Sequence, residues 1–143
     1  MNQNDRRRYL IEELLKERPE YENMQIPSDA GEQKMLLRSL MNIRMPEEID
    51  PAFLQIQDAY LSEENEKKGI VTLADIREMQ PDLYIWKGDI TRLKVGAIVN
   101  AANSGMTGCY QPCHNCIDNC NHYLYHFRPL RMKPLPVSAI GSD

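Results

Sequence analysis

The chain has 143 residues, close to the usual size of one domain, and 42% of them are hydrophobic, which is enough for a core. Its formal net charge of -4 argues against a general nucleic-acid-binding protein, which would ordinarily be basic. No apolar run approaches the roughly 20 residues of a membrane span, and the polar N-terminus lacks the apolar segment of a signal peptide, so we expect a cytoplasmic protein without membrane or nucleic-acid partners.

The N-terminal half has the pattern of helices. Apolar residues recur at helical spacing in three stretches, Tyr9–Leu15, Met35–Ile43 and Phe53–Leu61. The expected caps and stops of these helices are Pro19, Ser28 or Asp29, Pro46, Asp50 and Pro51. This region contains no motif with ligand or catalytic spacing. Residues 1–68 are therefore expected to be a helical extension that packs on the following domain or binds a partner.

A second unit is expected at residues 69–122, after the polar stretch Ser62–Gly69. It begins with a short helix predicted at Thr72–Ile76, followed by two strands. These strands are Leu83–Trp86 and Ala97–Asn100, the second continuous enough to be buried on both faces. Two such strands separated by a loop and a short helix indicate an α/β sheet, although only two of its strands can be found.

The last part of the chain has a different composition. Arg128–Pro136 contains three prolines and has no amphipathic period. Residues 123–143 are therefore expected to be an irregular tail rather than a helix or a central strand.

All four cysteines lie between Cys109 and Cys120, together with His114. Thiolates combined with imidazole suit zinc, and a reducing compartment favours metal ligation over disulfides. A reasonable three-ligand set is Cys109, His114 and Cys116. His114 and Cys116 can face the same way in an extended loop, and a turn at Gly108 can bring Cys109 toward them. Cys120 would be either a fourth ligand or a small buried thiol.

Two interpretations of this cluster stay open. Three protein ligands with an open fourth position are typical of catalytic zinc, whereas a closed four-ligand site is structural. A structural zinc staple without a catalytic role is therefore the alternative, and His122 is interpreted as an ordinary helix histidine. The spacing does not repeat a Cys-x2-Cys pair, which disfavours a treble-clef or ribbon site.

Two loops before the cysteine cluster have the groups that a nucleotide site needs. Asp89 can accept a hydrogen bond from an exocyclic amine, and the backbone N–H of Ile90 can serve the same ring. Asn103 offers a donor and an acceptor to ribose hydroxyls, and the small residues before it let the backbone approach a ligand. Each loop alone could be an ordinary turn or helix cap, but their order before the metal cluster favours a nucleotide site.

Trp86–Thr91 and Val95–Ser104 resemble the opening strand and loop of the macrodomain family, which binds ADP-ribose. Gly108–Asn119 is similar to the distinctive insert of zinc-dependent microbial macrodomains, which are protein-ADP-ribosyl hydrolases with a helical N-terminal extension. The resemblance covers about Leu83 to Cys120. It implies a partial macrodomain, an incomplete mixed sheet with flanking helices, preceded by the helical extension. A truncated or frameshifted reading frame after about Cys120 would explain the unrelated tail.

The resemblance also implies roles for individual residues. Zinc would be held by Cys109, His114 and Cys116. ADP-ribose would be contacted by Asp89, Ile90, Asn103, Cys116, Ile117 and Asp118. Asn103 and Asp118 would lie by the distal ribose as the catalytic residues, with Asp118 orienting a water or acting as a base.

The activity that the resemblance implies is a zinc-dependent hydrolase that removes ADP-ribose from modified proteins. A sirtuin-type ADP-ribosyltransferase and a lipoyl-carrier protein are the implied partners. The alternative is an inactive fragment, in the form of a non-catalytic ADP-ribose-binding module or a zinc-stabilised structural module.

Overall fold

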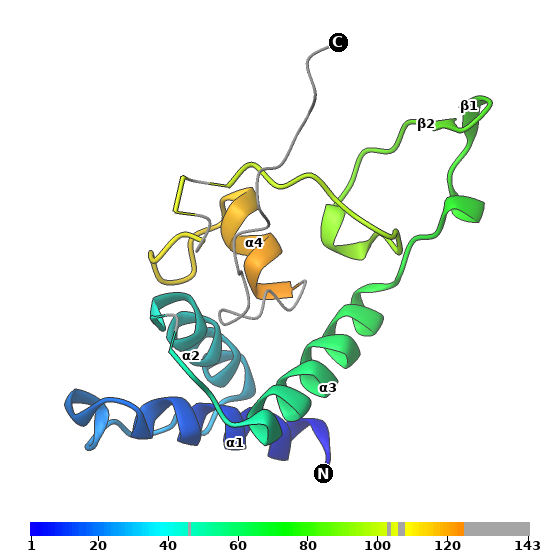
Figure 1. Cartoon of the computed structure of the whole chain (residues 1–143). Coiled ribbons are helices and arrows are strands. Elements are labelled where there is room, and N and C mark those ends of the chain that lie inside the picture. Colours follow the sequence, from blue (N-terminus) through cyan, green and yellow to red (C-terminus); the bar gives the residue numbers. More distant parts are fainter. Residues whose placement is uncertain (46, 103, 106–107, 125–143) are drawn as a thin grey trace.

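The computed structural model describes residues 1–45, 47–102, 104–105 and 108–124. Three long helices lie together at one end of the molecule, and a shorter fourth helix packs beside the second of them (Figure 1). These helices are α1 (Gln3–Lys16), α2 (Ala30–Ile43), α3 (Pro51–Lys68) and α4 (Ile117–Leu124). None of the helices in these ranges is both long and apolar enough to cross a membrane.

Two of the long helices, α2 and α3, begin at the predicted caps. Asp29 caps α2 and Asp50 caps α3, each by accepting a hydrogen bond from a backbone N–H of the first turn, and Pro51 is the first residue of α3. α3 continues through the polar stretch that was expected to separate two units and ends at Lys68. Gly69, with a φ of 84°, then stops the helix in a conformation that favours glycine.

The core lies among the three long helices. Its buried apolar side chains are Leu10, Ile11, Leu14, Leu15, Leu37, Leu40, Phe53, Tyr60 and Leu61. Each fully buried side chain of this size stabilises the fold by about 1.5–3 kcal/mol. The same burial raises the pKa of Tyr60 to about 12.

Ion pairs at the edge of this core explain why the charged end of α3 is helical. Glu63 pairs with Arg6 of α1 at 2.7 Å, and Glu64 pairs with Lys34 of α2 at 2.6 Å. The polar residues after Leu61 therefore contact the other two helices.

Residues 69–100 form an extended arm that leads away from the long helices and returns (Figure 1). β1 (Glu78–Gln80) and β2 (Leu83–Tyr84) pair antiparallel in a hairpin at the far end of the arm. Near its base, Val71 and Leu93 form a parallel bridge, which brings the two ends of the arm together.

The predicted short helix of the arm is confirmed. Thr72 caps the 3-10 helix η2 (Leu73–Asp75), and its backbone N–H donates to the Asp75 side chain at 2.8 Å.

The prediction of a buried strand at Ala97–Asn100 is wrong. These residues form no strand, and Val99 is 94% exposed. A strand buried on both faces needs covering elements on both sides and a pairing partner, and in the described part of the chain the sheet consists of β1 and β2 alone. The described residues are therefore mixed α and β structure, compatible with an α/β class.

Candidate metal centre

Three side chains of the loop before α4 converge on one point. The ligand atoms of Cys109, His114 and Cys116 all lie within 4.8 Å of one another, and Cys109 Sγ is 3.3 Å from His114 Nδ1. Ligand atoms around a tetrahedral zinc ion are about 3.5 Å apart, given its usual bond lengths to sulfur and nitrogen. The three residues therefore fit the size and the chemistry of a metal site.

The remaining two cysteines face other groups. Cys113 Sγ lies 3.1 Å from the Ser39 hydroxyl, and Cys120 Sγ accepts from Arg38 Nη2 at 3.7 Å. All four cysteines are free thiols. Within the described residues, Cys109, His114 and Cys116 are thus the group that could hold a metal ion, and the other two thiols are not part of it.

Two residues with positive φ shape the loop. Gly108 has a φ of 84°, and a Cβ at this position would lie 3.1 Å from Cγ of the His122 ring, so the turn that begins the loop requires glycine. Cys113 has a φ of 52°, a strained value for a residue with a side chain. Its backbone N–H donates to Asn42 Oδ1 at 3.3 Å, which helps to hold this conformation.

Asn119 connects the loop to α4. Its side chain is 0% exposed, and its Nδ2 donates to the backbone carbonyls of Cys109 and Gln111, both at 3.2 Å. Its backbone N–H donates to Cys116 Sγ at 3.4 Å. Cys116 therefore lies directly before the first residue of α4, and its sulfur accepts from a backbone N–H of the first turn, as a helix cap does.

Asp118 lies in the first turn of α4 and is only 6% exposed. Its Oδ1 accepts from Asn100 Nδ2 at 2.7 Å and lies 3.2 Å from His122 Nε2. Asn100 is held in turn by Asn121, whose Nδ2 donates to Asn100 Oδ1 at 2.7 Å. Asn100 and His122 therefore orient the Asp118 carboxylate, which lies two positions after a candidate metal ligand.

The expected adenine contacts lie on η3 (Ile90–Arg92), a 3-10 turn that packs against both α3 and α4. Asp89 caps η3, because its Oδ1 accepts from the Thr91 backbone at 3.0 Å and from the Thr91 hydroxyl at 2.6 Å. Partial burial alone would raise the pKa of Asp89. The two hydrogen bonds, with Lys68 and Arg92 nearby, set this pKa below its usual value instead.

The other sequence-predicted residues are placed as follows. Ile117 and Asp118 follow Cys116 directly as the first residues of α4, with Ile117 exposed. Asn103 lies outside the described residues, so its place at a ribose stays a prediction. The irregular tail was predicted to begin at residue 123, but Tyr123 and Leu124 are the last two residues of α4. The rest of that predicted tail, residues 125–143, lies outside the described residues.

Sequence reasoning missed the polar residues that hold the loop from outside. These are Arg38, Ser39, Asn42, Asn100, Asn119 and Asn121. The first three interrupt the apolar second half of α2 at a spacing that places them on one side of it, which is the signal that would have found them. Buried asparagines have no comparable signature in one sequence.

Comparison with known proteins adds relatives but no family profile, since none of the protein-family profiles matches the chain. It is 59% identical over 126 residues to the protein-ADP-ribose hydrolase of Treponema medium, a match that covers 85% of this chain and 48% of that protein. It is 40% identical over 115 residues to the protein-ADP-ribose hydrolase of Staphylococcus aureus (strain MRSA252), covering 80% of this chain and 43% of that protein.

A more distant relative comes from a fungus. A probable bifunctional ADP-ribose hydrolase/ADP-ribosyltransferase of Fusarium oxysporum f. sp. cubense is 38% identical over 101 residues, which is 61% of this chain and 16% of that protein. The chain spans about half the length of the bacterial relatives that it matches. Over that span, it is a homologue of proteins named protein-ADP-ribose hydrolase.

Proposed function

We propose that this chain carries the metal-binding part of a zinc-dependent hydrolase that removes ADP-ribose from modified proteins. The observation that carries the proposal is the convergence of the ligand atoms of Cys109, His114 and Cys116. It occurs in a chain 59% identical to a protein-ADP-ribose hydrolase. We propose further that residues 69–122 are part of a macrodomain and residues 1–68 its helical extension.

The donor set supports zinc as the ion. Two thiolates and one imidazole are ligands that zinc prefers, and Cys109, His114 and Cys116 would hold it. When bound, the ion would supply Lewis acidity, which polarises an oxygen or lowers the pKa of a bound water to about 7. Because thiolate ligands must stay reduced, we propose a reducing compartment, the cytoplasm, as the place of action.

Asp118 is the proposed base of the reaction. Hydrolysis breaks the bond between the distal ribose carbon and the protein side chain, and the oxygen of water forms the new bond to that carbon. Asp118 would take a proton from the water, and the departing side chain would receive one. Asn100 and His122 both contact Oδ1 of Asp118, which fixes the orientation of the carboxylate. This supports Oδ2 as the atom that would accept the proton. Asn103 would contact the distal ribose.

The rest of ADP-ribose would extend toward η3. Asp89 and Ile90 are the proposed adenine contacts, and the packing of η3 against α4 supports this path, because α4 carries Ile117 and Asp118. Cys116, Ile117 and Asp118 would line the ligand near the metal. An ADP-ribosylated protein is the proposed substrate. A sirtuin-type ADP-ribosyltransferase and a lipoyl-carrier protein are proposed partners on the family resemblance alone.

The test measures release of ADP-ribose from a modified protein by the wild-type chain and by Cys116→Ala. The matched control is Cys120→Ala, which removes a thiol outside the three-ligand set. We expect Cys116→Ala to lose both zinc and release, and Cys120→Ala to retain both. Undiminished release after loss of zinc would reject the metal role. Zinc binding without release by the wild type would support the alternative, a non-catalytic ADP-ribose-binding or zinc-stabilised module.

A further inference from the structure

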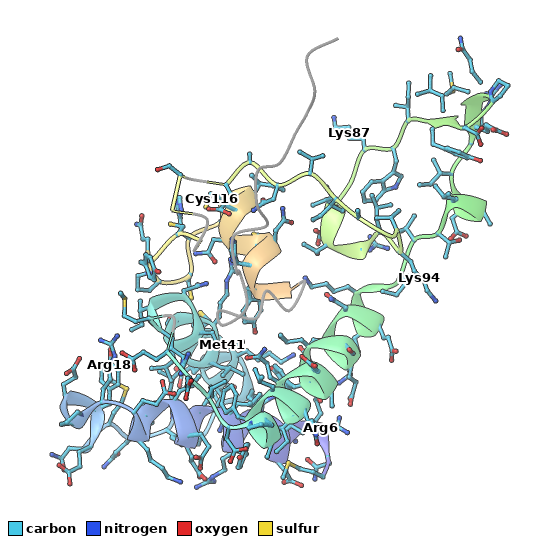
Figure 2. All side chains as sticks on the ribbon, viewed as in Figure 1. Arg6, Arg18, Met41, Lys87, Lys94 and Cys116 are labelled. Atoms are coloured by element: carbon cyan, nitrogen blue, oxygen red, sulfur yellow. The ribbon has the colours of Figure 1, made fainter. Side chains whose placement is uncertain are left out.

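Helix α2 has two faces with different partners. Leu37 and Leu40 are buried in the core of the long helices. On the other face, Arg38, Ser39 and Asn42 contact α4 and the loop of residues 108–116 before it, called the metal loop below. Spacings of three and four residues place these polar side chains on one side of the helix. Figure 2 shows the loop that carries Cys116 beside the helix that carries Met41.

Arg38 holds the backbone of a candidate ligand. Its Nη2 donates to the carbonyl oxygen of His114 and to Asn115 Oδ1, both at 3.1 Å. Its guanidinium carbon lies 5.7 Å from the ring centroid of Tyr123 on α4, a cation–π arrangement. Arg38 therefore joins α2 to the metal loop and to α4 at the same time.

Asn42 uses both ends of its amide. Its Nδ2 donates to Asn119 Oδ1 at 2.7 Å, and its Oδ1 accepts from the backbone N–H of Cys113 at 3.3 Å. The Asn119 amide nitrogen already faces two backbone carbonyls, those of Cys109 and Gln111, so its oxygen is the atom that meets Asn42. A continuous chain of hydrogen bonds thus runs from α2 through Asn119 to the first metal ligand.

Hydrogen bonds from Asn119 and Arg38 contact all three candidate ligands. Asn119 donates from its side chain to the Cys109 carbonyl and from its backbone N–H to the Cys116 sulfur. Arg38 donates to the His114 carbonyl. Arg38 and Asn42 act from the helical extension, which is far from the loop in sequence: Asn42 and Asn119 are separated by 77 residues.

We propose that α2 positions the metal loop, with Arg38 and Asn42 as positioning residues that keep Cys109, His114 and Cys116 within reach of one ion. This inference rests on the proposed function, since it takes these three residues as the zinc site. Removing groups that orient metal ligands from outside typically weakens metal affinity by 10–100-fold, because the ion must then order the ligands as it binds. The helical extension is thereby part of the metal centre.

The test compares Asn42→Asp with the wild type in the full chain. Aspartate keeps an acceptor for the Cys113 N–H but replaces the donor to Asn119 by an oxygen, so two oxygens face each other. We expect Zn²⁺ affinity, measured by competition with a chromophoric chelator, to fall by about 10–100-fold. With Co²⁺ as a spectroscopic probe, we expect altered visible bands, which report coordination geometry. The matched control is Met35→Ala, which changes a 60% exposed side chain of the same helix and should bind as the wild type does.

Folding of each variant is checked by thermal unfolding of the metal-free protein, followed by circular dichroism. If Asn42→Asp does not fold, Arg38→Met replaces it. This variant keeps an unbranched stem, removes the Arg38 donor to the His114 carbonyl, and is expected to weaken Zn²⁺ binding in the same direction. A folded variant with wild-type Zn²⁺ affinity and an unchanged Co²⁺ spectrum overturns the positioning role and leaves the zinc site standing. A wild-type chain that binds no Zn²⁺ overturns the proposed metal site itself, and this inference with it.

Discussion

The side chain of Asn119 donates a hydrogen bond to the carbonyl oxygen of Cys109 at 3.2 Å, so that α4 holds the residue that opens the metal loop. The same amide donates to Gln111 and accepts from Asn42, and none of it is exposed. One buried side chain therefore bonds to groups from two segments, the loop before α4 and helix α2. Its removal should affect the loop and α2 together.

Asn119→Ala leaves the Cys109 carbonyl and the Asn42 amide without the Asn119 partner, whereas the Gln111 carbonyl keeps the hydrogen bond from the His114 backbone N–H at 3.2 Å. Each buried group left unsatisfied costs about 1–3 kcal/mol, so the free energy of unfolding should fall by at least about 2 kcal/mol. Urea unfolding in the presence of a chelator measures this loss without a contribution from metal. The control is Asn115→Ala, an exposed asparagine of the same loop, for which a change below about 1 kcal/mol is expected. Equal losses in the two variants would show that the buried amide has no special role.

We expect added Zn²⁺ to divide the four cysteines into two pairs that differ in their rate of alkylation. Cys109 and Cys116 belong to the converging set, whereas Cys113 and Cys120 face Ser39 and Arg38. Because the free thiolate is the reacting species, Zn²⁺ should protect the first pair from alkylation and leave the second pair's rates unchanged. Mass spectrometry of alkylated peptides with and without Zn²⁺ measures each site. Protection of Cys113 in place of Cys116 would contradict the ligand assignment.

Asp118→Asn tests the proposed base without changing the shape of the site. Asparagine keeps an Oδ1 that can accept from Asn100, but it cannot take a proton from water. The rate of ADP-ribose release should fall by about 10²–10⁴-fold, the usual contribution of a positioned acid or base. Zn²⁺ affinity is the internal control and should change little, since Asp118 is not among the three converging ligands. Loss of zinc together with release would reassign Asp118 to the metal site.

Local signals in the sequence predicted local structure well. Asp29, Asp50 and Thr72 cap helices as expected, because a cap acts within one turn of the chain. The proximity of Cys109, His114 and Cys116 also follows from short spacing. These features could be predicted because the interacting groups are near neighbours in the sequence.

Features that depend on distant partners could not be predicted. The apolar run Ala97–Asn100 was expected to be a buried strand, but an apolar run becomes a strand only when another strand pairs with it. The hydrogen bond between Asn42 and Asn119 spans 77 residues and involves two side chains that have no distinctive pattern. Such contacts are determined by how the helices pack rather than by any local motif.

The ionised carboxylate of Asp89 stabilises the 3-10 turn η3 by capping it. The pKa of Asp89 in the folded chain lies below the ordinary 3.8, despite partial burial that opposes this, because Thr91 donates two hydrogen bonds and Lys68 and Arg92 are near. A depressed pKa means that the stabilisation is present above pH 3.8 and is lost as the pH falls through the lower, folded-state value. Carboxyl-carbon NMR shifts during an acid titration measure this pKa. Thr91→Val should move the pKa of Asp89 upward, and an unchanged pKa would show that the hydroxyl makes no contribution.

Gly69 joins α3 to the arm at a φ of 84°, and a Cβ there would lie 3.2 Å from Nη2 of Arg92. Arg92 cannot move away freely, because its Nε donates to the Gly69 carbonyl at 2.7 Å. Gly69→Ala should therefore lower the free energy of unfolding by about 1–2 kcal/mol, the cost of a left-handed residue with a side chain. Gly96 has open space around it and no positive φ, so Gly96→Ala should be neutral or stabilise by about 0.4–1 kcal/mol. Denaturant unfolding of both variants measures the difference. A similar effect at both glycines would mean that the backbone conformation at Gly69 is not what fixes the arm to the helical extension.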